Sequence, residues 1–84
     1  MKIEIVDYFD VWGNEKDGWE VNDVIIHRDV EIETSEDIFE KLIDLRLIPQ
    51  DSEWEDYQVM DLGESVEFID KQNDLPICAV YFVI

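Results

Sequence analysis

The chain has 84 residues, which is too short for two independent cores, so we expect a single domain over residues 1–84. Hydrophobic residues make up 46% and aromatic residues 12%, more than a disordered acidic tail carries. Against 23 Asp and Glu stand only 6 Lys and Arg, giving a formal net charge of −17. This charge predicts that the chain binds neither nucleic acid nor an anionic membrane directly, because both surfaces would repel it.

The sequence shows neither a membrane-spanning segment nor a secretion signal. No run approaches the roughly 18 apolar residues of a membrane helix, and the N-terminus enters a patterned segment at once. We therefore expect a cytoplasmic protein. Cys78 is the only cysteine and sits in an apolar run, which predicts a buried core residue and excludes an internal disulfide or a thiolate zinc site.

The first third of the chain is typical of a β-hairpin. Residues 3–12 are rich in β-branched and aromatic side chains, with a slip in the alternation at Val6–Asp7 that predicts a bulge there. Residues 13–18 have glycine at each end and predict a turn into a second strand over residues 19–26. Residues 30–33 either continue this strand or add another. Trp12 and Trp19 flank the turn and are expected to pack as a cross-strand pair.

A single helix is expected in the middle of the chain. Thr34 or Ser35 offers an N-cap, and apolar residues at helical spacing predict about ten to twelve helical residues that end before Pro49. A charged loop, residues 50–56, follows. The apolar positions are Ile38, Phe39, Leu42, Ile43 and Leu45.

Three strands close the predicted chain, over Tyr57–Leu62, Ser65–Asp70 and Pro76–Ile84. The last is nearly all apolar, so we expect it at the centre of the sheet, covered by the helix. The sequence therefore predicts an α+β fold. It is a mostly antiparallel sheet of about five strands with one amphipathic helix packed on one face, in the order β-β-α-β-β-β.

The outer face of the predicted helix is a stripe of carboxylates. Glu36, Glu40 and Asp44 follow at i, i+4 and i+8, which places them about 6 Å apart and costs a few tenths of a kcal/mol per like-charge pair. Folding does not require this repulsion. The spacing resembles that of successive phosphates, which predicts a surface that mimics nucleic acid for a basic partner. A dispersed acidic coat that serves only solubility is the alternative interpretation.

The charged loop extends this surface in the prediction. Trp54, surrounded by carboxylates, is expected to act as an apolar anchor for the partner. The residues predicted to bind the partner are Glu36, Asp37, Glu40, Asp44, Asp51, Glu53, Trp54, Glu55 and Asp56.

The sequence lacks the motifs of common catalytic sites. His27 is the sole histidine, so a hydrolytic triad or a histidine-based metal site cannot be assembled. Residues 51–56 superficially suggest a calcium loop, but the twelfth position would be Leu62 instead of an acidic residue. There is no glycine-rich phosphate loop. We expect no enzymatic activity, no cofactor and no metal ion.

Two stretches resemble small acidic proteins of phages and mobile elements. These are residues 10–22 (DVWGNEKDGWEVN) and the terminal pair VEFID at 66–70 with PICA at 76–79. The resemblance implies a mobile-element origin and, if the chain is phage-encoded, a location in the bacterial host cytoplasm. Together with the charge it makes the chain similar in kind to anti-CRISPR and other anti-defence proteins, several of which mimic nucleic acids. It assigns no functional residue.

The predicted function is a non-enzymatic inhibitor that blocks the basic nucleic-acid-binding site of a host defence complex, such as a nuclease or a CRISPR effector. Three alternatives stay open. They are an immunity protein or antitoxin against a basic toxin, a phage accessory protein whose acidity serves only solubility, and a carboxylate-based metal binder.

Overall fold

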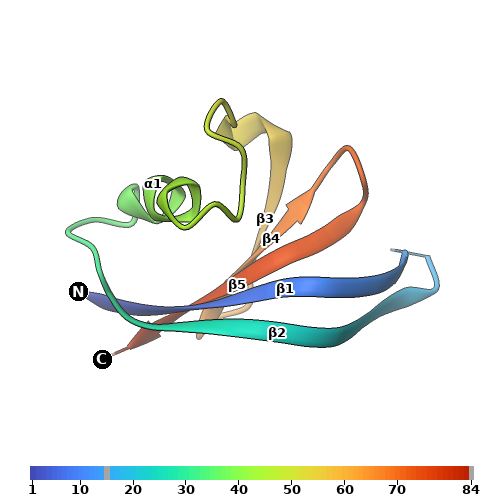
Figure 1. Ribbon diagram of the computed structural model, residues 1–84, viewed down its shortest axis with the longest axis horizontal. Coiled ribbons are helices and arrows are strands. Elements are labelled where there is room, and N and C mark those ends of the chain that lie inside the picture. The colour runs from blue at the N-terminus through green and yellow to red at the C-terminus, as the bar shows by residue number, and fades with distance from the viewer. Residues whose placement is uncertain (15, 84) are drawn as a thin grey trace.

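The structure is a computed structural model that describes residues 1–14 and 16–83 (Figure 1). Glu15 of the predicted turn and Ile84 of the predicted last strand lie outside the described residues. The architecture is α+β, with a mostly antiparallel five-stranded sheet and one α-helix. Its elements are β1 (Lys2–Asn14), β2 (Gly18–Glu31), α1 (Asp37–Asp44), the 3-10 helix η1 (Trp54–Asp56), β3 (Tyr57–Asp61), β4 (Ser65–Asp70) and β5 (Leu75–Val83).

The strands lie in the spatial order β2-β1-β5-β4-β3, and every paired neighbour is antiparallel. This order differs from the order along the chain because β5 inserts between β1 and β4. The apolar last strand thus occupies the centre, where it has a neighbour on each side. The predicted strand over Ser65–Asp70 is confirmed, and residues 30 and 31 continue the second strand.

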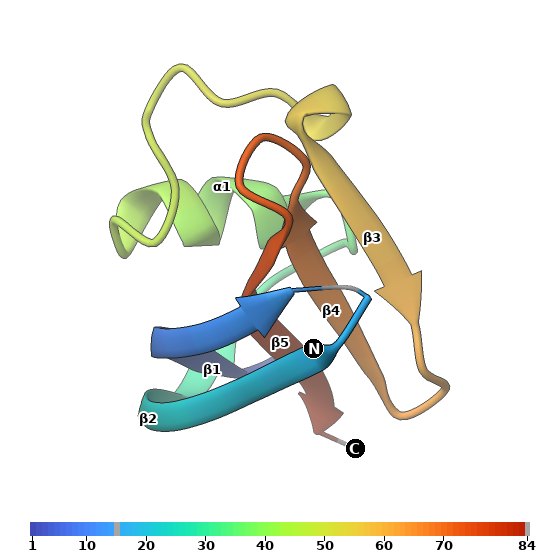
Figure 2. The ribbon, with the colours of Figure 1, turned by 90° about the vertical axis from the view of Figure 1, so that its right-hand side faces the viewer.

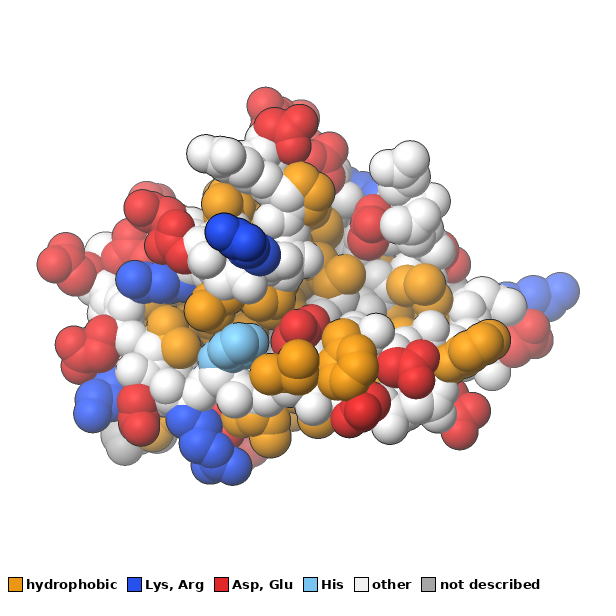
Figure 3. Space-filling model, viewed as in Figure 1, with side chains coloured by type: hydrophobic (Ala, Val, Ile, Leu, Met, Phe, Trp, Pro, Cys, Tyr) orange, Lys and Arg blue, Asp and Glu red, His pale blue; other side chains and the backbone are white. Residues whose placement is uncertain are grey.

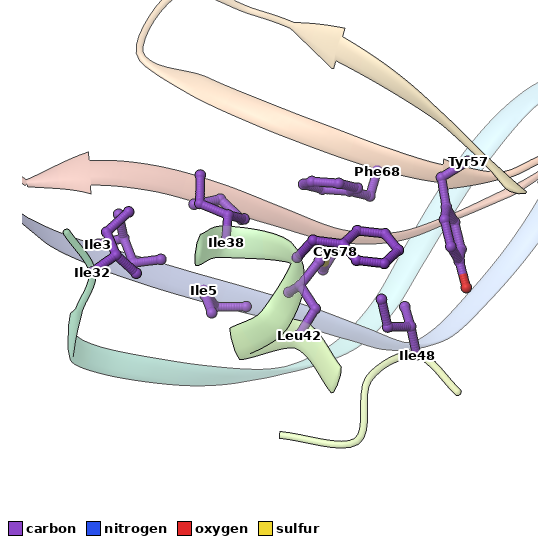
Figure 4. Packing of buried hydrophobic residues seen from close by; sticks show 11 residues of the cluster. Ile3, Ile5, Ile32, Ile38, Leu42, Ile48, Tyr57, Phe68 and Cys78 are labelled. Carbon is purple, nitrogen blue, oxygen red and sulfur yellow. The ribbon is translucent and has the colours of Figure 1, made fainter. Parts of the chain in front are cut away.

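The buried core joins β1, β3, β4 and β5 with the helix (Figure 4). Cys78 and Val80 of β5 are fully buried, as the sequence predicts for Cys78. In Figures 1 and 2, α1 lies above β1 and β2. The cluster comprises Ile3, Ile5, Ile32, Ile38, Phe39, Leu42, Ile48, Tyr57, Phe68, Cys78 and Val80.

The paired register assigns each strand residue to one of two faces. Asp7, Cys78 and Phe68 stand opposite one another across β1, β5 and β4, and Cys78 and Phe68 belong to the core cluster. We call this side the cluster face. Because side chains alternate along a strand, the adjacent row lies on the opposite side, which we call the back face. That row crosses all five strands as Ile26, Val6, Ala79, Glu67 and Met60.

The helix is shorter than the sequence predicts. It has eight residues with Glu36 at the N-cap, instead of ten to twelve residues capped by Thr34 or Ser35. At its end, Arg46 adopts a left-handed φ of 64°, the Leu47 N–H donates to the Leu42 carbonyl and the Arg46 N–H donates to that of Ile43. These two bonds form a Schellman motif, which ends the helix well before Pro49.

The predicted bulge at Val6–Asp7 is wrong. Pairing is regular there, and the irregularities in the β1–β2 ladder fall between Ile3 and Ile5 and around Asp10. Ile3 pairs with Val30 whereas Ile5 pairs with His27, so the extra residue belongs to β2, where Asp29 has a φ of 57°. A bulge in the partner strand leaves Ile3 and Ile5 both buried on the cluster face.

The predicted cross-strand pair of Trp12 and Trp19 is also wrong. Trp19 stands opposite Gly13 and Trp12 opposite Glu20, so the two indoles belong to adjacent rows of the ladder and to opposite faces. Trp19 Nε1 donates instead to the backbone oxygen of Asp74 in the β4–β5 turn, at 3.0 Å. Trp12 Nε1 donates to Asp10 Oδ1, and its side chain is exposed.

Candidate partner-binding surface

The acidic residues in and next to helix α1 are of two kinds: some are exposed and unbonded, and one accepts hydrogen bonds from the backbone. Glu36, Glu40 and Asp44 are exposed, and within the described part of the chain their side chains form no hydrogen bond or ion pair. Asp37 differs, because its Oδ2 accepts the backbone N–H of Glu33 at 2.9 Å and of Thr34 at 3.0 Å. These bonds, the one to Thr34 first, hold the pKa of Asp37 below its usual value. Asp37 therefore fixes the turn that precedes the helix.

The loop after the helix also contains both hydrogen-bonded and unbonded carboxylates. Asp56 Oδ2 accepts the backbone N–H of Glu53 at 2.9 Å, and the two residues form a capping box around η1. Asp51 and Glu55 are exposed and are left facing solvent. An open hollow of about 450 Å³ lies beside them, lined by Pro49, Asp51, Ser52, Glu55, Asp56, Tyr57, Asp70, Lys71 and Gln72.

Trp54 combines exposure with firm support from below. Its ring stacks on Phe39 with centroids 4.6 Å apart and lies 5.9 Å from the ring of Phe68, while 46% of the residue stays exposed. Beside it runs an apolar groove of about 220 Å³, with Glu36 at its edge. The groove is lined by Ser35, Glu36, Ile38, Trp54, Val59, Val66, Phe68 and Phe82.

The nine predicted residues do not all line the same hollow. Asp51, Glu55 and Asp56 share one hollow, and Glu36 lies with Trp54 at the apolar groove. Asp37 and Glu40 line a third hollow together with Glu31, Glu33 and Lys41, and Asp44 lies beside Arg46 in a fourth. In Figure 3, acidic side chains gather over the loop at the top of the view and over the segment leading into α1, with apolar side chains between them.

The structure adds residues that local sequence reasoning missed. Asp70, at the end of β4, joins the hollow beside Asp51 through the pairing of β3 with β4. Phe39, predicted only as a core residue, is the platform under Trp54. The aromatic spacing between residues 39 and 54 gives no local signal of this contact, because it depends on the return of the chain after Pro49.

The carboxylates of the described residues form almost no ion pairs. Among the residues that the structure describes, the single ion pair joins Arg28 Nη1 and Glu4 Oε1 at 3.5 Å, on an exposed surface. Every other hydrogen bond that an acidic side chain accepts in the described chain comes from a backbone N–H group or from a neutral side chain. Lys41, Arg46 and Lys71 lie beside carboxylates of the helix and loop, but none of them forms an ion pair there within the described chain.

Other chemistry on the surface is limited. Over residues 1–14 and 16–83, there is no group of three or more His, Cys, Asp or Glu side chains arranged to hold a metal ion. Burial, with added repulsion from Asp7 and Glu67, raises the pKa of the Cys78 thiol to about 12. A thiol that stays protonated is a poor nucleophile. No helix in the described residues is long and apolar enough to cross a membrane.

Comparison of the chain with protein-family models, curated proteins and solved structures found no match.

Proposed function

We propose that this protein is a non-enzymatic inhibitor that binds the basic nucleic-acid-binding surface of a host defence complex or nuclease and excludes its DNA or RNA by competition. In this proposal α1 packs on the cluster face through Ile38, Phe39 and Leu42. Glu36, Glu40 and Asp44 then point toward the partner.

The observation that carries the proposal is that no carboxylate of the helix or loop forms an ion pair within the described chain, although Lys41, Arg46 and Lys71 lie nearby. A small domain is adequately soluble with a net charge of about 2 to 8, so −17 exceeds that need. Unpaired carboxylates lose little on meeting a basic surface, because no internal ion pair must first be broken. The partner gains the electrostatic attraction that nucleic acid would supply.

Trp54 provides the apolar part of the proposed contact. A half-exposed indole held from below by Phe39 is already ordered, so binding costs little additional side-chain entropy. Aromatic anchors surrounded by polar contacts are frequent hot spots of protein interfaces.

The proposal is tested by capture from a nuclease-treated bacterial lysate at low and high salt. Three baits are compared: the wild type, the site variant E40Q/D44N/D51N/E55Q and the control variant E20Q/D29N/E64Q/D74N. Both variants remove four exposed negative charges, but the control removes them outside the helix and loop.

We expect the wild type and the control to retain the same nucleic-acid-binding protein at low salt, and the site variant to lose it. Retention should also fall at high salt, because exposed charges are screened. The proposal is contradicted if no nucleic-acid-binding protein is retained, or if both variants lose it equally.

A further inference from the structure

The back face of the sheet carries an uncovered apolar patch. Its side chains lie on one side by register, since Ile26, Val6, Ala79, Glu67 and Met60 form one row across the five strands. Five of its large apolar residues are between 37% and 47% exposed. We define the back-face patch as Val6, Tyr8, Val24, Ile26, Met60, Tyr81 and Val83.

The patch is separate from the core cluster that includes α1. None of its residues belongs to that cluster or to the partly buried residues packed against it. Ala79 and Ile69 are almost fully buried yet also lie outside the cluster, so the back face has buried residues of its own. Large exposed apolar patches on a soluble domain mark interaction sites.

The charge of this face differs from that of the rest of the chain. By register and contact it carries two cations, Lys2 and Arg28, and three carboxylates, Glu4, Glu31 and Glu67. Glu4 pairs with Arg28, and Glu67 accepts the Tyr8 hydroxyl. The face is thus one charge from neutral, while the remaining residues hold 20 carboxylates against 4 cations out of the chain totals of 23 and 6.

We propose that the back-face patch is a homodimer interface, in which two copies of the chain stack sheet to sheet about a two-fold axis. A second copy is the occupant that this charge distribution favours. Over the helix and loop, two copies would bring carboxylates together, and a basic partner would gain little from a near-neutral face. Two-fold symmetry places the same patch on both sides, so its apolar residues meet their equivalents.

The dimer directs both acidic helix and loop surfaces outward. Each dimer could then engage two sites on a basic partner, which raises overall avidity without any new contact. The inference does not depend on the proposed function, because stacking uses neither the helix nor the loop.

Dimerisation and binding of a basic partner should respond to salt in opposite directions. Charge repulsion between two copies opposes dimerisation and is screened by salt, so the dimer should strengthen as NaCl rises. Binding of a basic partner should weaken over the same range. Failure of one proposal is therefore distinguishable from failure of the other.

The test is sedimentation equilibrium of the full chain between about 5 and 500 µM, at about 0.05 and 0.5 M NaCl. The variants are I26K and the matched control I25K. The two isoleucines are adjacent and similarly exposed, at 44% and 48%, but Ile26 lies on the back face and Ile25 on the cluster face. Y81K is a second back-face variant in case I26K does not fold, which circular dichroism checks.

We expect the wild type and I25K to approach twice the chain mass of 10.0 kDa, more readily at high salt. I26K and Y81K should each raise the dimer Kd by roughly a hundredfold, because symmetry introduces two lysines into the apolar contact. A wild type that stays monomeric at the highest concentration and salt overturns the proposal. So does a dimer that I25K and I26K weaken equally.

Discussion

The Tyr8 hydroxyl donates to Glu67 Oε2 at 3.3 Å and so links β1 to β4 across the intervening strand β5. Ala79 is the β5 residue paired with Glu67, and its small side chain leaves room for the bridge. The contact joins residues 59 positions apart. It fixes the two halves of the sheet relative to each other on the back face.

Removing this bridge by Y8F should lower the free energy of unfolding by about 1 kcal/mol, the usual worth of one such hydrogen bond. Urea denaturation followed by tryptophan fluorescence measures the change. The control is Y81F, which removes the hydroxyl of an exposed back-face tyrosine that forms no hydrogen bond with the described residues. Equal effects of the two variants would contradict a specific role for the bridge.

The same bridge predicts an alkaline pH dependence of stability. Burial, followed by the charge of Glu67, raises the pKa of Tyr8 above its ordinary value. The folded state then holds a proton that the unfolded chain releases above about pH 10. Stability should fall as pH rises beyond that point, and it should fall less in Y8F. A pH series of urea midpoints measures this; parallel profiles of the two proteins would contradict it.

Cys78 should be inert to alkylation in the folded protein. Its thiol is buried and its pKa is raised to about 12, so thiolate forms only when the core opens. We expect iodoacetamide at pH 8 to alkylate Cys78 at least about 1,000-fold more slowly in the folded protein than in the urea-unfolded chain. The ratio of the two rates should be about the fraction of time for which the core is open. Mass spectrometry follows the reaction. Comparable rates in the two states would contradict the buried placement.

Repulsion between Glu40 and the carboxylates four residues away should reduce the stability of the protein measurably. Glu40 repels Glu36 and Asp44, each four residues away, so E40Q should raise the free energy of unfolding by about 0.5 kcal/mol at low salt. Thermal denaturation should show a gain of a few degrees that shrinks as NaCl is added. E64Q, in the β3–β4 turn, is the control and should change little. A gain in E40Q that persists unchanged at high salt would not be electrostatic.

The strands follow from local patterns, whereas the helix ends do not. Alternation and β-branched content locate Ser65–Asp70, and the unbroken apolar run places β5 at the centre. The helix ends at a Schellman motif whose left-handed residue is Arg46, where glycine is usual, so no sequence signal marks it. Asp29 likewise takes a positive φ and moves the bulge into β2.

In the candidate surface, too, some features follow from local sequence patterns and others depend on the tertiary structure. Its exposed carboxylates, such as Glu36 and Glu40, follow from helical spacing. The bonds of Asp37 and Asp56 to backbone N–H groups could not be predicted, because they depend on the turns before α1 and in η1. The meeting of Trp54 with Phe39, and of Asp70 with the loop, depends on tertiary packing and strand pairing.

The central claim is competition with nucleic acid, and the most direct measurement is displacement of a labelled oligonucleotide from the captured partner. Fluorescence anisotropy is followed while the wild type, E40Q/D44N/D51N/E55Q or E20Q/D29N/E64Q/D74N is added. We predict full displacement by the wild type and the control, and at least a hundredfold higher concentration for the site variant. Nucleic acid that stays bound while the partner is saturated with the wild type would contradict the account.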